Sequence, residues 1–101
     1  MKSILVLYHS QQFGNIHMMA EAFKDGIQEA GAKATLHNTN QNRFNIEEYR
    51  QYDAIAIGSP DYFSYIAGTL KTFLDDWFLA KSRNPEGLTH KSYGLFHSYD
   101  Q

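Results

Sequence analysis

Two polar loops carry the residue types that could do chemistry in this chain. Residues 10–15 follow a short apolar run and precede a helical pattern. Backbone N–H groups and the helix dipole at such a helix start favour an anion, and Gly14 permits close backbone approach. The neutral donors of this loop are Ser10, Gln12 and Asn15. No Lys or Arg occurs between Ser3 and Phe23, so the loop suits a monophosphate better than a metal-bound triphosphate. An ordinary strand-to-helix turn with an Asn cap is the alternative.

The second loop, residues 59–65, brings three aromatic side chains to the same predicted edge: Tyr62, Phe63 and Tyr65. Aromatic faces can enclose a flat ring. For Phe63 we favour packing beneath the loop. For Tyr62 and Tyr65, ring contact and simple loop packing remain equally open.

Other chemistries find little support. Five histidines, His9, His17, His37, His90 and His97, form no i, i+4 pair and no H-E-x-x-H motif. His9 and His97 each end a predicted strand, but we expect them to be solvated or loop histidines, and no metal site is assigned. Walker, G-x-G-x-x-G and G-x-S-x-G motifs are absent. No side chain stands out as an acid or base, so the catalytic residues are unknown.

The elements that must position these loops alternate along the chain. Apolar runs predict buried strands over residues 4–7 and 54–58. Residues 33–36 are predicted as a short second strand and residues 92–96 as a last strand. Helical spacing predicts helices over residues 16–30, 46–51 and around 70–78. Such alternation predicts an α/β fold with a doubly wound parallel sheet in the order 2-1-3-4. Ligands of such sheets bind beyond the carboxyl ends of the strands, where both loops lie.

Two apolar faces and one cap complete the secondary-structure prediction. The first helix should bury Ile16, Met19, Ala20, Phe23, Ile27 and Ala30. The third should bury Leu70, Phe73, Leu74, Trp77 and Phe78. Asn45 with Glu48 resembles an N-cap with its capping-box partner. The Asn- and Gln-rich residues 38–45 are interpreted as a solvated loop.

Composition limits the class of protein. The chain has 101 residues, which predicts a single domain over residues 1–101. A net charge of −2 argues against nucleic-acid binding, and the absence of Cys excludes thiolate sites. No apolar run is long enough to span a bilayer, so we expect no membrane partner and a cytoplasmic location.

The two loops together resemble the flavodoxin-like family, closest to its WrbA-type and NADPH-dependent FMN reductase branch. The similarity lies in residues 8–16, YHSQQFGNI, and in residues 58–63, GSPDYF, with the helix start at 67–75. The resemblance implies FMN as cofactor, electron transfer or flavin-dependent reduction as function, and a redox partner or nicotinamide donor. The implied phosphate site is Ser10, Gln12, Gly14, Asn15 and Ile16. The implied ring contacts are Pro60, Asp61, Tyr62 and Phe63, and a third flavin loop begins at Ser98 and Tyr99.

Three departures from the family pattern carry expectations. Ile16 replaces a hydroxyl donor common in the family. Asp61 would place a carboxylate near the ring and lower the flavin potential. The chain also lacks the usual fifth strand and last helices, which would leave residues 92–96 as an open edge and bare apolar surface. We therefore expect a homo-oligomer. The alternatives are a truncated non-enzymatic α/β module that oligomerises through this edge with little or no flavin binding, and a site for another phosphorylated ligand.

Overall fold

The computed structural model describes residues 2–10, 15–60, 68–89 and 91–98. Its elements alternate as the sequence predicts. They are β1 (Ser3–Tyr8), α1 (Asn15–Glu29), β2 (Lys33–Asn38), α2 (Ile46–Tyr49), β3 (Ala54–Pro60), α3 (Gly68–Arg83) and β4 (Ser92–Ser98). The predicted helix over 46–51 is shorter than expected, because α2 ends at Tyr49 with Arg50 as its C-cap.

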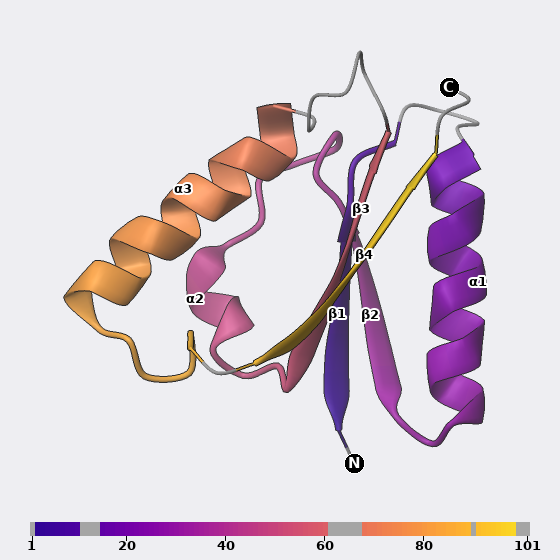
Figure 1. Cartoon of the computed structure of the whole chain (residues 1–101), viewed down its shortest axis with the longest axis horizontal. Helices are drawn as coiled ribbons and strands as arrows, with labels where there is room; N and C mark the ends of the chain where they lie inside the picture. The colour runs from indigo at the N-terminus through magenta and orange to yellow at the C-terminus, as the bar shows by residue number, and fades with distance from the viewer. Residues whose placement is uncertain (1, 11–14, 61–67, 90, 99–101) are drawn as a thin grey trace.

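The strands form a parallel sheet in the order β2-β1-β3-β4, which confirms the predicted doubly wound topology. Leu5 of β1 lies between Thr35 of β2 and Ile55 of β3. Helix α1 covers one face of the sheet, and α2 and α3 lie on the other (Figure 1). Within the described residues the sheet has four strands and no fifth, so β4 forms one of its edges. The described part of the chain contains no helix that is both long and apolar enough to cross a bilayer.

Alternate residues of β1 supply the two halves of the core. Leu5 and Leu7 are fully buried against α2 and α3 in one apolar cluster. Val6 and Tyr8 are buried in a second cluster that includes Ile16 of α1. A strand buried on both faces needs apolar residues at every position, which explains the continuous run that identified it.

The two long helices bury narrower stripes than the sequence predicts. In α1, Phe23 is 41% exposed, and Ala30, which lies beyond the end of the helix, is exposed too. In α3, Leu74 is 40% and Phe78 is 58% exposed, so the prediction that they are buried was wrong. The stripe of α3 that faces the sheet instead ends at Ala80, which is buried. Leu74 lines an open hollow that α3 shares with β3 and β4.

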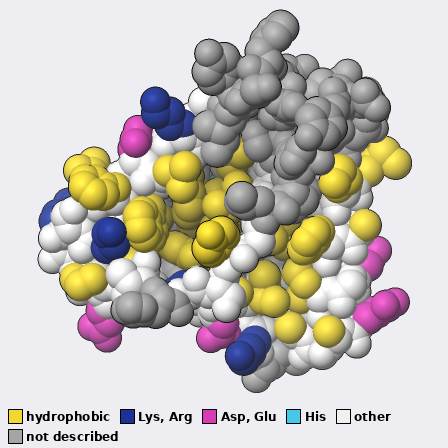
Figure 2. Space-filling view, viewed as in Figure 1, with side chains coloured by type: hydrophobic (Ala, Val, Ile, Leu, Met, Phe, Trp, Pro, Cys, Tyr) yellow, Lys and Arg dark blue, Asp and Glu magenta, His cyan; other side chains and the backbone are white. Residues whose placement is uncertain are grey.

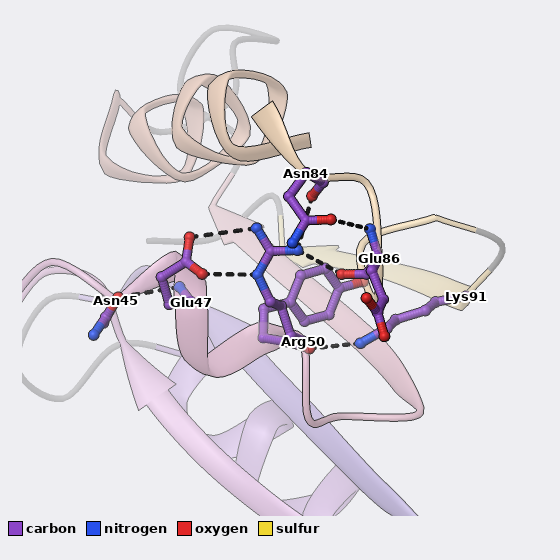
Figure 3. A network of polar contacts seen from close by, with 7 residues as sticks. Asn45, Glu47, Arg50, Asn84, Glu86 and Lys91 are labelled. Atoms are coloured by element: carbon purple, nitrogen blue, oxygen red, sulfur yellow. Dashed lines mark hydrogen bonds and ion pairs between the residues drawn. The ribbon is translucent and has the colours of Figure 1, made fainter. Parts of the chain in front are cut away.

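A polar network fastens α2 to the segment between α3 and β4 (Figure 3). Asn45 caps α2 as predicted, with its side chain accepting from the Glu47 amide at 3.0 Å. The Arg50 guanidinium donates to the Glu47 carboxylate and to the carbonyls of Asn84 and Glu86. Arg50 thereby holds the turn that leads into β4, on the amino-terminal side of the sheet.

Candidate functional site

The carboxyl ends of the strands converge at one edge of the sheet. Tyr8 at the end of β1 lies level with Asn38 of β2 and with Gly58 of β3. Pro60 and Ser98, the last residues of β3 and β4, pair with each other. All three segments that the resemblance assigns to a flavin therefore start at this edge, where α1 also begins (Figure 1).

Two asparagines at and just after the end of β2, beside the end of β1, hold the backbone of Ser10 through their side chains. The Asn38 side chain accepts from the Ser10 amide at 3.1 Å and donates to the Ser10 carbonyl at 2.9 Å. It also accepts from the Asn40 amide at 3.0 Å, and the Asn40 side chain donates to the Ser10 carbonyl at 3.2 Å. The Asn38 amide thus continues the β1–β2 pairing one step past the strand ends, and Ser10 is almost fully buried.

The orientation of the Asn38 amide follows from its partners. A backbone N–H can only donate and a carbonyl can only accept, so Oδ1 must face the Ser10 amide and Nδ2 the Ser10 carbonyl. Position 38 therefore requires a side chain that carries a donor and an acceptor side by side. We name this arrangement of Asn38 and Asn40 on Ser10 the Ser10 brace.

His9 follows β1 as a loop residue, as expected, but it is buried beside the Ser10 brace rather than solvated. It is 9% exposed, and its Nδ1 lies 2.7 Å from the Thr69 hydroxyl at the start of α3. Thr69 in turn contacts the Thr39 hydroxyl at 2.7 Å. Burial lowers the pKa of His9 below its ordinary value, so the ring is neutral near pH 7.

A second histidine contacts the other side of β1. The Tyr8 hydroxyl lies 2.8 Å from His17 Nδ1, and His17 Nε2 lies 3.6 Å from a Glu21 carboxylate oxygen. Burial, followed by the charge of Glu21, raises the pKa of the Tyr8 hydroxyl. The Tyr8 phenol therefore stays protonated and serves to attach the first turn of α1 to the core.

The structure positions part of the predicted site. Ile16 is fully buried in the core below α1, so the group that it can present at the helix start is its backbone amide. Asn15 is the first residue of α1, and Pro60 and Ser98 end their strands at the same edge. Outside the described residues lie Gln12, Gly14, Asp61, Tyr62, Phe63 and Tyr99. In the described ranges no group of three metal-ligating side chains occurs.

Sequence reasoning missed the residues that hold this edge together. Asn38 and Asn40 belong to the stretch interpreted as a solvated loop, and Thr39 is buried there as well. One signal could have identified Asn38, because in a parallel sheet of this order the second strand ends level with the first. The long-range contact between Thr69 and Thr39 has no counterpart in local sequence patterns.

The fold defines an α/β domain of the flavodoxin-like class, and ligands of such sheets bind where the winding reverses. The model of the family described as Flavodoxin matches residues 6–101 of the sequence. The chain therefore belongs to the flavodoxin family, and membership of this family implies a flavin cofactor.

Individual relatives agree with this assignment. The chain is similar to an NAD(P)H dehydrogenase (quinone) of Paracoccus denitrificans, with 32% identity over 93 residues, covering 74% of this chain and 44% of that protein. Among solved structures it is similar to a WrbA-like flavodoxin from Agrobacterium tumefaciens, with a TM-score of 0.69 and 27% identity, covering 96% of this chain and 59% of that one. A flavodoxin from the domain Archaea shares the fold, with a TM-score of 0.64 and 19% identity, covering 92% and 82%. The chain spans less than half the length of the dehydrogenase it matches.

Proposed function

We propose that this chain binds FMN at the carboxyl edge of its sheet and takes part in electron transfer or flavin-dependent reduction. The observation that carries the proposal is the Ser10 brace, which fixes the backbone where the first loop leaves β1. Three long-range side-chain bonds hold the backbone of one serine, at the point where a phosphate loop must be rigid. Supporting hydrogen bonds of this kind preorganise a binding site.

The donor chemistry of the edge favours a flavin monophosphate. The groups that would hold the phosphate are the Ser10 hydroxyl and the backbone amides at the start of α1, including that of Ile16. Because the Ser10 amide is already committed to Asn38, its hydroxyl is the group that would turn to the phosphate. Pro60 would border the ring. The flavin supplies the redox chemistry when bound, and this edge binds and orients it.

An FMN titration of the full chain tests the proposal. We expect saturable quenching of flavin fluorescence at micromolar FMN and much weaker quenching with riboflavin, which lacks the phosphate. Ser10→Ala should weaken FMN binding about tenfold, the equivalent of one hydrogen bond to a charged group. Ser82→Ala, which removes an exposed hydroxyl bonded within α3, is the matched control and should change nothing. Equal affinity for FMN and riboflavin would contradict the phosphate site, and no quenching at all would contradict flavin binding.

The electron donor and acceptor are proposed from the relatives. The similar Paracoccus denitrificans protein is named for NAD(P)H and quinone, and this chain corresponds to less than half of it. We propose a nicotinamide donor for this chain as well, to be tested by following NADPH and NADH oxidation with FMN and a soluble quinone. Bound FMN without oxidation of either nucleotide would leave electron transfer with another partner as the function. The cytoplasmic location stays a prediction.

A second candidate, a module that assembles through β4, has its own supporting observation. Apolar side chains collect between α3 and β4 (Figure 2), around a hollow of about 620 Å³ that includes Leu74, Trp77 and Tyr93. Tyr93 on β4 is 74% exposed. An open strand edge beside bare apolar surface favours pairing with a second copy.

Light scattering tests this assembly. We expect a mass above that of one chain for the wild type and a lower mass for Tyr93→Lys, because lysine on an edge strand opposes pairing. Met18→Lys changes an equally exposed apolar side chain on α1 and is the matched control. A monomeric wild type at micromolar concentration would contradict the proposed homo-oligomer. An oligomer that does not respond to FMN would favour this candidate over the first.

A further inference from the structure

A chain of side-chain hydrogen bonds connects the end of β1 with the start of α3. His9 Nδ1 lies 2.7 Å from Thr69 Oγ1, and Thr69 Oγ1 lies 2.7 Å from Thr39 Oγ1. Thr39 Oγ1 donates to the Tyr8 carbonyl at 3.2 Å. His9 and Thr39 are buried. This series of hydrogen bonds thus joins three segments that are distant in sequence: the end of β1, the turn after β2 and the first turn of α3.

With the Thr39 hydroxyl donating to the Tyr8 carbonyl, the hydrogens of this series of bonds all point the same way. A carbonyl oxygen only accepts, and a hydroxyl has a single hydrogen to donate. The Thr39 hydrogen goes to the Tyr8 carbonyl, so Thr69 must donate its own hydrogen to Thr39. The contact between Thr69 and His9 then needs a hydrogen on the histidine. In this arrangement His9 Nδ1 is the protonated nitrogen.

This assignment distinguishes His9 from a histidine that merely fills space. Because burial lowers the pKa of His9, its ring carries one hydrogen near pH 7. Free neutral imidazole side chains prefer that hydrogen on Nε2, so the Nδ1–H form requires a specific acceptor. Thr69 is that acceptor, and its own hydroxyl is oriented in turn by Thr39.

We propose that His9 is a positioning residue of the flavin edge, which fastens the segment before Ser10 to the first turn of α3 through an Nδ1–H donor. Ser10 begins the loop that the resemblance assigns to the flavin phosphate, and α3 follows the loop assigned to the ring. The His9–Thr69 contact therefore ties the residue before Ser10 to the first turn of α3. This inference rests on the proposed function, since it gives the histidine a part in flavin binding.

Long-range proton–nitrogen NMR of the ¹⁵N-labelled full chain, without flavin, tests the hydrogen assignment. At pH 7.5 the His9 ring of the wild type should show a protonated Nδ1 and an unprotonated Nε2. Thr69→Val removes the acceptor and should shift the ring toward the Nε2–H form. Thr72→Val is the matched control, because its hydroxyl bonds only within α3 to the Gly68 carbonyl. An Nε2–H wild type, or an Nδ1–H form that persists in Thr69→Val, would overturn the proposal.

Flavin affinity tests the positioning role with two replacements of different shape. The amide nitrogen of asparagine is attached to Cγ, as Nδ1 is in histidine, so His9→Asn can still donate to Thr69. His9→Phe fills the same space and donates nothing. We expect His9→Asn to bind FMN within about threefold of the wild type and His9→Phe to bind about tenfold more weakly, a loss of one hydrogen bond. Equal affinities of the two variants would overturn the role of the donor.

The two sets of outcomes separate this inference from the proposed function. If the wild type binds no FMN, the proposed function fails, and the ring assignment still decides whether the hydrogen-bond chain exists. If the wild type binds FMN while the ring is in the Nε2–H form, the function stands and the inference is wrong. Should His9→Phe not fold, Thr69→Val supplies the affinity measurement, because valine preserves the size of threonine.

Discussion

Removing the Asn38 side chain should destabilise the whole domain, because Asn38 closes the sheet beyond its last backbone pair. Asn38→Ala eliminates two bonds to the Ser10 backbone and one to the Asn40 amide. Each neutral hydrogen bond contributes about 0.5–1.5 kcal/mol net. The Ser10 carbonyl keeps its bond from Asn40, but the buried Ser10 amide loses its acceptor. We expect a loss of about 2–3 kcal/mol in the free energy of unfolding.

Urea unfolding followed by circular dichroism measures this loss. In a domain of this size the same loss lowers Tm by roughly 10–20 °C. Asn38→Asp separates the two halves of the interaction, since a carboxylate still accepts from the two amides but cannot donate to the Ser10 carbonyl. We expect it to lose about 1–2 kcal/mol, and to lose less at low pH, where the carboxyl regains a hydrogen.

Asn42→Ala provides the matched control for Asn38→Ala. Asn42 is the same residue type in the exposed segment that follows β2, and its contribution to His37 comes from its backbone carbonyl, which alanine retains. Its substitution should stay within about 0.5 kcal/mol of the wild type. If Asn38→Ala also falls within that range, the Ser10 brace does not stabilise the edge, and the argument from its geometry fails.

Three further predictions concern other parts of the chain. Gly87→Ala should destabilise the fold more than Gly31→Ala. Both glycines have positive φ, of 74° and 89°, but only at Gly87 would the new Cβ meet the Arg50 carbonyl oxygen, at 3.0 Å. Equal losses in urea unfolding would refute this steric reason. The folded state should lose stability as pH falls below about 6.5, because burial lowers the pKa of His9 and the unfolded chain then binds more protons. The dependence of the unfolding free energy on pH should flatten in His9→Asn, and an unchanged dependence would assign the effect to other groups. If FMN binds, Asp61→Asn should raise its midpoint potential, by roughly 30 mV for each 1.4 kcal/mol of repulsion removed in a two-electron couple, and equal potentials would place Asp61 away from the ring.

The fold could be predicted from the sequence because a buried strand appears there as an uninterrupted run of apolar residues. Leu5, Val6 and Leu7 are all fully buried, and only a strand covered on both faces requires such an uninterrupted run. The predicted buried faces of the helices were less accurate. Leu74 and Phe78 continue the apolar spacing of α3 but flank the stripe that meets the sheet. Periodicity gives the direction of an apolar face, but its width depends on what covers it.

The candidate site was predictable only to the level of its loops. Parallel topology placed the segments after β1 and β3 at one edge, which the strand register confirms for Tyr8 and Gly58. The side chains that stiffen the edge come from elsewhere in the chain. Asn38 acts through space on Ser10, and His9 acts through Thr69, so neither role follows from local spacing. Such long-range polar pairs become visible only once the chain is folded.

The strand order also constrains how this protein is made. β1 leaves the ribosome first, yet it becomes an inner strand, and Leu5 must wait for Thr35 and then Ile55 before both of its sides are paired. Every ladder in the sheet closes a long loop, and folding rates fall when contacts join distant residues. Among the four strands, β1 therefore stays unpaired longest during synthesis, and its apolar side chains are exposed to a nascent-chain chaperone for that time.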